Sequence, residues 1–159
     1  MNDKNKYFPL FLDMSRMKIV IVGGGAIATR RALTLCRFDT NLEIVAPTLT
    51  TRLQQLIETE NIAYKKMTYT ESVLADKDLV LACTNDLEVN HRIFEDCKKR
   101  NLLVNNCSDK EECDFYFPAV VYTDDIVIGI NGGGKDHRRV KQVRERIEEC
   151  MSFMTCTKS

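Results

Sequence analysis

A short apolar strand that runs directly into a glycine turn and then a helix constrains this chain more than any other feature. Residues Lys18–Val22 are mostly β-branched, and Gly23, Gly25 and Ala28 take the small-residue positions of a G-x-G-x-x-G/A pattern. The first glycine permits a tight turn, the second lets a pyrophosphate approach the backbone, and the alanine lets the helix pack against the strand. Free N–H groups where the helix begins, near Ala26, favour an anion. The pattern therefore predicts a dinucleotide site.

The first two thirds of the chain alternate between predicted strands and helices. Strands are predicted over Lys18–Val22, Asn41–Val45, Ile62–Met67, Asp78–Cys83 and Leu102–Asn105, and helices over Ala26–Phe38, Leu49–Ile57, Glu71–Leu74 and Leu87–Arg100. This alternation, with strands that are nearly all apolar, predicts an α/β fold with a Rossmann-like, doubly wound parallel sheet. Ligands of such sheets bind outside the carboxyl ends of the strands, so the loops that follow the strands are expected to share one edge.

The pattern changes near Cys113. Two β-rich runs, Phe115–Tyr122 and Ile126–Ile130, predict a β-hairpin, and a charged helix is predicted over Lys135–Met154. A lone hairpin is marginally stable in water, so we expect this appendage to pack against a second copy of the chain in a homodimer. The predicted domains are a dinucleotide-binding Rossmann domain over residues 1–112 and a hairpin and helix dimerisation region over residues 113–159.

The composition argues against several function classes. Lys plus Arg and Asp plus Glu are equal at 23 each, so no net charge favours a nucleic acid or a membrane surface as partner. No apolar run is long enough to span a bilayer, and the polar start Met1–Lys6 lacks the apolar core of a signal peptide. The seven cysteines are scattered without a C-x-x-C pair, which predicts neither a disulfide framework nor a metal site. A cytoplasmic location fits best.

Loops after the second and fourth predicted strands extend the dinucleotide site. The second strand ends in Ala46-Pro47-Thr48, where an acidic residue usually grips the ribose 2′-hydroxyl of NAD. Neither an acid nor an arginine for a 2′-phosphate stands there, so Thr48 and the backbone are expected to hold the ribose. The acidic residue typical of NAD sites is therefore absent, although NAD remains the favoured cofactor. Thr84 can donate to a ribose or phosphate oxygen. The predicted cofactor-binding residues are Gly23, Gly24, Gly25, Ala26, Ile27, Pro47, Thr48 and Thr84.

The loop after the fifth predicted strand is where we expect catalytic polar groups. Asp109 is the carboxylate nearest to the predicted cleft, and a carboxylate can accept a proton from a substrate. Ser108 could orient the substrate, and Asn105 is expected to contact it. An aspartate that only stabilises a loop turn is an equally good interpretation of Asp109.

A basic segment follows the glycines of residues 132–134. Phosphate or polycarboxylate binding at a helix start is a sound use for such a segment, and we interpret it as a substrate-binding region. A solvated helix face is the competing interpretation of a charge run. The predicted substrate-binding residues in this segment are Gly133, Lys135, His137 and Arg138.

Several motifs in a fixed order give the chain a specific resemblance. They are Tyr7–Asp13, Val22–Gly25, Val45–Pro47, Ala82–Asp86 with Asn90, Cys113–Ala119 and Gly133–Lys135. As an ordered set they resemble the precorrin-2 dehydrogenase family of siroheme synthesis, which includes the amino-terminal part of siroheme synthase. The resemblance extends from Tyr7 to about Ile147, nearly the whole chain.

The resemblance implies NAD-dependent oxidation of precorrin-2, a tetrapyrrole with many carboxylates, to sirohydrochlorin, in a homodimer that exchanges the hairpin and the helix. Some members of the family also insert ferrous iron. Ser108 stands where the family commonly has a catalytic aspartate, with Asp109 directly after it. Two alternatives are therefore open, namely a non-catalytic module that binds NAD or a tetrapyrrole, and a sirohydrochlorin metal chelatase.

Overall fold

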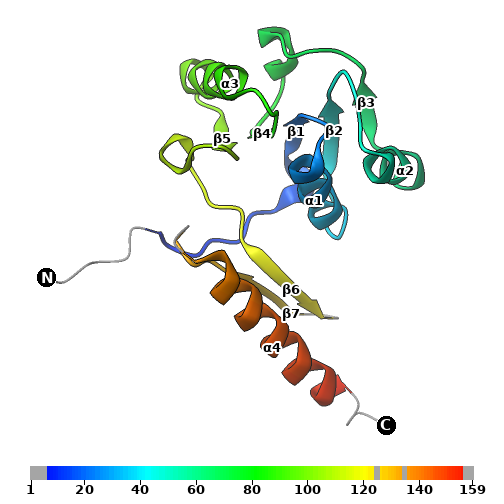
Figure 1. Cartoon of the computed structure of the whole chain (residues 1–159), viewed down its shortest axis with the longest axis vertical. Coiled ribbons are helices and arrows are strands. Elements are labelled where there is room, and N and C mark those ends of the chain that lie inside the picture. The colour runs from blue at the N-terminus through cyan, green and yellow to red at the C-terminus, as the bar shows by residue number, and fades with distance from the viewer. Residues whose placement is uncertain (1–6, 124–125, 134–135, 156–159) are drawn as a thin grey trace, which may run out of the picture. The chain divides into compact units, whose positions relative to one another are not determined.

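The computed structural model describes residues 7–123, 126–133 and 136–155, with side chains to residue 152 (Figure 1). Two compact units are distinguished in the chain. The first comprises residues 12–115, and the second comprises the residues before 12 together with those after 115. The boundary at the C-terminal side of the sheet unit therefore falls between Phe115 and Tyr116.

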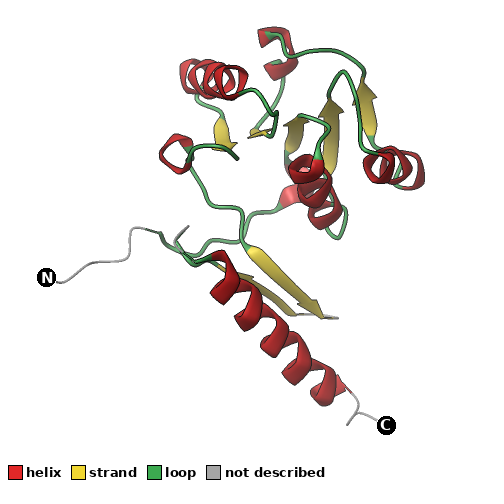
Figure 2. Cartoon of the chain, viewed as in Figure 1, coloured by secondary structure: helices red, strands yellow, loops and turns green. Residues whose placement is uncertain are grey.

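The sheet unit contains the predicted alternation of strands and helices. Its elements are η1 (Met14–Arg16), β1 (Lys18–Val22), α1 (Ala26–Leu35), β2 (Asn41–Val45), α2 (Thr51–Thr59), β3 (Ala63–Lys65), η2 (Glu71–Leu74), β4 (Leu79–Ala82), α3 (Leu87–Arg100), β5 (Leu103–Asn106) and η3 (Lys110–Glu112). The strands pair in the order β3-β2-β1-β4-β5, all parallel. Figure 2 shows these strands in yellow with red helices around them. The predicted Rossmann-like parallel sheet is confirmed.

The strand order places the site at one point of the sheet. The chain moves outward from β1 to β3, then returns to the other side of β1 to form β4 and β5. Right-handed crossovers put α1 and α2 on one face and α3 on the other. The direction of winding reverses between β1 and β4, and a crevice opens at such a point outside the carboxyl ends of the strands.

The core explains why β4, and β1 after its exposed first residue Lys18, are apolar. Residues 19–22 of β1 and 79–82 of β4 are all buried, as expected for central strands covered on both faces. One core cluster packs Val20, Val80 and Val104 from three strands against Ile93 and Cys97 of α3. Burial of these apolar side chains fixes the strand ends in place.

Local signals set the ends of the helices. Thr50 caps α2 by accepting from the Leu53 N–H at 3.2 Å, and Asp86 caps α3 by accepting from the N–H groups of Glu88 and Val89. α1 ends at Leu35, three residues earlier than the sequence predicts, because residues 36–38 turn away from the helix. α3 ends at Arg100, and the residue that follows, Asn101, caps it in a left-handed conformation with φ of 56°.

The second unit contains an antiparallel hairpin and a long helix. Its elements are β6 (Ala119–Thr123), β7 (Ile126–Ile130) and α4 (His137–Thr155), and α4 packs on β6. The predicted first strand begins later than expected, at Ala119, because Pro118 cannot donate to a ladder. Tyr7 stacks on Tyr116 with ring centroids 4.1 Å apart, which joins the N-terminal segment to this unit. Within the described residues, no helix combines the length and the apolar character needed to cross a bilayer.

Candidate functional site

The glycine turn after β1 is shaped by two close backbone approaches. Gly23 has φ of +129°, a conformation that L side chains rarely adopt, and a Cβ there would lie 2.3 Å from the carbonyl oxygen of Cys83. Its N–H donates to the Val45 carbonyl at 2.8 Å. Gly23 is therefore required by the fold, because it lets the turn pass between the ends of β2 and β4.

Gly24 holds the turn against the loop that precedes α2. A Cβ at this position would lie 2.0 Å from the Thr48 carbonyl oxygen, and the Gly24 carbonyl accepts from the Thr50 N–H at 2.9 Å. The hydroxyls of Thr29 and Thr50 are 2.8 Å apart, and the Thr29 hydroxyl also donates to the Gly25 carbonyl. These contacts make the turn, the start of α1 and the loop after β2 one rigid assembly.

Gly25 differs from Gly23 and Gly24 because the space where its side chain would lie is open. Its φ is −84°, and the nearest atom to a Cβ there would be Asn85 Oδ1 at 3.7 Å. Gly25 is also the N-cap of α1, and no side chain caps this helix. Among the described residues, none accepts from the N–H groups of residues 25–27. A diphosphate fits this place, since it would fill the open space and accept from those N–H groups.

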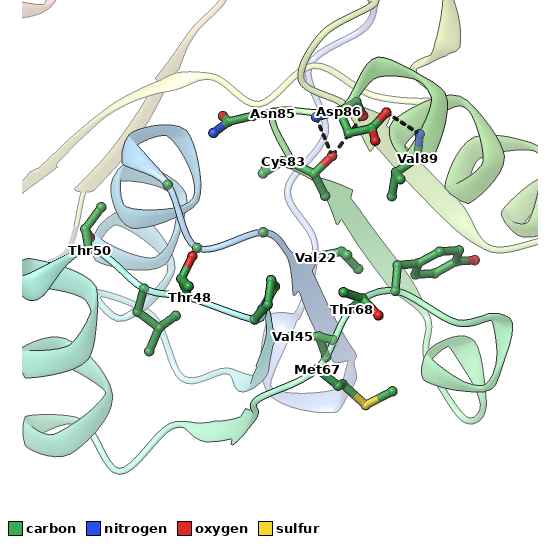
Figure 3. Close-up of a pocket in the computed structure, with 17 residues that line it drawn as sticks. Val22, Val45, Thr48, Thr50, Met67, Thr68, Cys83, Asn85, Asp86 and Val89 are labelled. Carbon is green, nitrogen blue, oxygen red and sulfur yellow. Dashed lines mark hydrogen bonds between the residues drawn. The ribbon is translucent and has the colours of Figure 1, made fainter.

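A cleft of about 420 Å³ opens beside the glycine turn (Figure 3). Val22, Val45 and Cys83 come from the ends of three central strands, with Thr48 and Thr50 on one side and Asp86 and Val89 on another. The full lining is Val22–Gly25, Val45, Pro47–Thr50, Met67–Tyr69, Cys83–Asp86 and Val89. The volume and the mainly apolar walls suit part of a dinucleotide.

Most of the predicted cofactor residues lie together in this cleft. The six that line it are Gly23, Gly24, Gly25, Pro47, Thr48 and Thr84. Ala26 and Ile27 are not part of the lining; both are exposed in the first turn of α1, where their N–H groups would face a bound anion. Sequence reasoning missed Met67, Thr68 and Tyr69, although the rule that ligands meet the carboxyl ends of strands applies to β3 as well.

A buried asparagine joins the loops that follow β4 and β5. Asn90 of α3 has no exposed surface; its Oδ1 accepts from the N–H and the hydroxyl of Thr84 at 3.1 and 2.7 Å. Its Nδ2 donates to the Thr84 carbonyl and to Ser108 Oγ, both at 3.1 Å. Ser108 in turn donates from its N–H and hydroxyl to Asn106 Oδ1. This network sets the position of Thr84; the sequence analysis names both Thr84 and Asn90 but does not predict the contact between them.

The residues predicted for catalysis lie on the same loop, outside the cleft lining. Ser108 and Asp109 are both exposed, and Asp109 caps η3 by accepting from the Glu111 N–H at 2.9 Å. Asn105 is buried and donates to the Phe115 carbonyl at 2.8 Å. Both Asn105 and Asp109 therefore make hydrogen bonds that stabilise the surrounding loop, and the Asp109 side chain is in addition exposed to solvent.

The remaining predicted substrate residues belong to the second unit. Gly133 has φ of +63° and donates to the Asn131 side chain, while His137 and Arg138 are exposed in the first turn of α4. Lys135 lies outside the described residues. In the described part of the chain, no group of three or more His, Cys, Asp or Glu residues is arranged to hold a metal ion.

Comparison with known proteins identifies a family of NAD(P)-binding domains and relatives from siroheme biosynthesis. The profile of the NAD_binding_7 family, described as NAD(P)-binding, matches residues 10–119. The multifunctional siroheme biosynthesis protein HemA of Ruminiclostridium josui is 42% identical over 143 residues, covering 89% of this chain and 28% of that protein. The siroheme synthase of Blochmanniella pennsylvanica is 35% identical, covering 90% of this chain and 30% of that protein. The chain thus spans about 30% of the length of these relatives.

A solved structure shares the fold. It is SirC, a precorrin-2 dehydrogenase, with a TM-score of 0.79 at 23% sequence identity, covering 90% of this chain and 70% of that one. The fold is therefore the same as in SirC. The resemblance to siroheme synthase that the ordered motifs predict is confirmed by the sequence similarities.

Proposed function

This chain belongs to the NAD_binding_7 family of NAD(P)-binding domains, and we propose that it oxidises precorrin-2 to sirohydrochlorin with NAD as the electron acceptor. The observation that carries the proposal is the open space beside Gly25, at an uncapped helix start that faces the cleft. The choice of substrate is supported by relatives named for siroheme biosynthesis that match about nine tenths of the chain.

The glycine turn and the threonines of the cleft would hold the dinucleotide. The N–H groups of residues 25–27 would bind the diphosphate, and Thr48 and the neighbouring backbone would hold a ribose. When bound, NAD supplies a two-electron acceptor for a hydride. The Thr84 hydroxyl donates its one proton to Asn90, so Thr84 would meet the dinucleotide as an acceptor for a ribose hydroxyl and not, as the sequence predicts, as a donor. Asn90 fixes its position, and the protein's main contribution is orientation of the reactants.

Asp109 is the residue that we propose as proton acceptor, with Ser108 beside it to orient the substrate. Its carboxylate is exposed on the loop that follows β5, the strand next to β4. The substrate's carboxylates would be met by Lys135, His137 and Arg138, with Gly133 and Asn105 as further substrate contacts.

We also propose that the chain acts as a homodimer in the cytoplasm. Large apolar side chains of the second unit are exposed, including Phe8 at 86%, Leu10 at 71% and Tyr122 at 40%. A second copy of the same unit would cover them. Sedimentation of the full chain as a monomer at micromolar concentration would contradict this part of the proposal.

Anaerobic turnover tests the proposed reaction. The full chain is incubated with precorrin-2 and either NAD or NADP, and the absorbance of the reduced cofactor is followed. We expect NAD to be reduced only when precorrin-2 is present. A protein that binds NAD in calorimetry and yet reduces none of it in the presence of precorrin-2 would refute the reaction while preserving the cofactor.

Two variants of Asp109 test its role. Asp109→Asn keeps an oxygen that can accept from the Glu111 N–H and removes the basic carboxylate, whereas Asp109→Ala removes both. We expect kcat to fall by about 100-fold in each variant, the size of effect typical of a general base, with the Kd for NAD unchanged. An unchanged kcat in Asp109→Asn would exclude Asp109 as the proton acceptor.

A further inference from the structure

Cys83, which lines the cleft, is in contact with Cys107, and the proposed reaction makes no use of either thiol. Cys83 and Cys107 directly follow Ala82 and Asn106, which are register partners on the parallel strands β4 and β5. The Cys107 N–H donates to the Ala82 carbonyl at 3.0 Å, so the ladder continues to this position. Their sulfur atoms are 2.8 Å apart.

The strand geometry allows these sulfurs to bond. Neighbouring strands lie ~4.8 Å apart, which falls within the ~4.4–6.8 Å that a disulfide spans between Cα atoms. Equivalent residues of paired strands point to the same face of the sheet. The sulfurs need to approach by only about 0.8 Å to reach the ~2.05 Å length of a disulfide bond.

The surroundings give the two thiols different roles. A hydrogen bond from the Cys83 thiol lowers the pKa of Cys107 to about 7, and the positive charge of Arg31 on α1 contributes further. The same hydrogen bond, together with burial, raises the pKa of Cys83 well above its ordinary range. Cys107 is half-buried and Cys83 only 3% exposed, so Cys107 is the thiolate that an oxidant can reach.

We propose that Cys83 and Cys107 form an oxidation-sensitive pair that closes to a disulfide and thereby weakens dinucleotide binding in the adjacent cleft. The co-reactant is a peroxide. The Cys107 thiolate attacks one peroxide oxygen, the O–O bond breaks, and a sulfenic acid and hydroxide result; the hydroxide takes up the proton lost by Cys107. The Cys83 thiol then attacks the sulfenic sulfur, and water leaves. In total, two thiols and one peroxide give one disulfide and two waters.

The contact between Cys83 and the glycine turn connects this bond to the cleft. Cys83 lines the cleft, and its carbonyl oxygen lies only 2.3 Å from the position that a Cβ of Gly23 would take. Thr84, another lining residue, follows it directly. The Cys83 N–H also donates to the Val22 carbonyl at 2.8 Å. A disulfide that displaces the Cys83 backbone would therefore displace the turn and Thr84 with it. The effect on affinity rests on the proposed binding of NAD, whereas the disulfide itself does not.

Peptide mapping and calorimetry on the full chain test the proposal. The protein is treated with a small excess of hydrogen peroxide, free thiols are blocked, and trypsin cuts after Lys77, Arg92, Arg100 and Lys110. We expect a crosslink between peptides 78–92 and 101–110, and a Kd for NAD raised at least threefold, both reversed by dithiothreitol. Cys107→Ser should bind NAD like the parent protein and stay unaffected by peroxide. Cys36→Ser, which removes a half-buried thiol elsewhere, should respond as the parent does.

Three results would overturn the proposal. One is the absence of the 78–92 to 101–110 crosslink in peroxide-treated parent protein, and another is a crosslinked protein whose Kd for NAD is unchanged. The third is a loss of affinity that persists in Cys107→Ser. Cys83→Ser, which removes the second thiol, gives an independent check on the crosslink if Cys107→Ser fails to fold. A reduced protein that binds NAD and does not oxidise precorrin-2 refutes the proposed reaction alone.

Discussion

Alanine at Gly23 and alanine at Gly25 separate the folding role of the glycine turn from its ligand role. At Gly23, the backbone conformation with φ of +129° disfavours any side chain, by about 1–3 kcal/mol. The added Cβ would meet the Cys83 carbonyl oxygen at 2.3 Å, and the overpacking adds about 1–3 kcal/mol. Reduced freedom of the unfolded chain returns about 0.4–1 kcal/mol. We therefore expect Gly23→Ala to lower the free energy of unfolding by about 1–6 kcal/mol.

Gly25→Ala is the matched control, because the same methyl group meets open space. Its φ of −84° suits alanine, and the nearest atom to the Cβ lies 3.7 Å away. The free energy of unfolding should change by less than about 1 kcal/mol. The methyl group would occupy the space that a diphosphate needs, so the Kd for NAD should rise at least tenfold, or about 1.4 kcal/mol.

Urea unfolding and calorimetric titration with NAD measure the two effects in the same preparations. For a chain of this size, the loss in Gly23→Ala should lower Tm by about 2–4 °C for each kcal/mol lost. The reasoning is refuted if Gly25→Ala is as destabilised as Gly23→Ala, because the open space would then not exist. It is refuted equally if Gly25→Ala keeps the parent Kd for NAD, since the diphosphate would then lie elsewhere.

Two further predictions concern buried polar groups. Asn90→Ala removes a fully buried side chain and its four hydrogen bonds to Thr84 and Ser108, and it leaves the half-buried Thr84 N–H unpaired. Urea unfolding should therefore show a loss of about 2–4 kcal/mol, and a loss below about 1 kcal/mol would contradict the network. Burial alone would raise the pKa of Glu43, yet hydrogen bonds from Lys65 and Lys77 outweigh it and hold the pKa below 4.5. The stability from this carboxylate is therefore present above the unfolded-state pKa and lost as pH falls through the lower folded-state pKa. Thermal unfolding between pH 6 and 3 should show that the Tm of the parent protein falls as the pH is lowered, and that the Tm of Glu43→Gln falls less steeply. Identical slopes of Tm against pH would refute a stabilising role for the Glu43 carboxylate.

Much of the fold could be predicted because its signals are local. The apolar run Lys18–Val22 followed by Gly23 identifies a buried strand and its turn from consecutive residues. The caps Thr50 and Asp86 begin helices through bonds to residues two or three positions away. The sequence prediction differed from the structure at element ends such as Leu35, where a turn competes with the last helical residues, and it missed the short helices η1 and η3.

The sequence predicted only those residues of the candidate site that belong to a recognisable motif. The glycine turn and Thr48 follow from sequence because each lies directly after a strand end. The burial of Asn90 could not be foreseen, because helical periodicity alone does not tell which loops a polar side chain will meet. Asp109 shows the same limit, since its bond to the Glu111 N–H depends on how the loop after β5 turns.

The sequence by itself determined the order of strands and helices, the turn at Gly23 and the apolar character of the central strands. Tertiary structure alone decided which strand ends became neighbours. Pairing of β4 with β5 brings Cys83 to Cys107, and pairing of β1 with β2 brings Gly24 to Thr48. These contacts join residues 24 positions apart, and they exist because parallel strands separated by a helix align their carboxyl ends at one edge of the sheet.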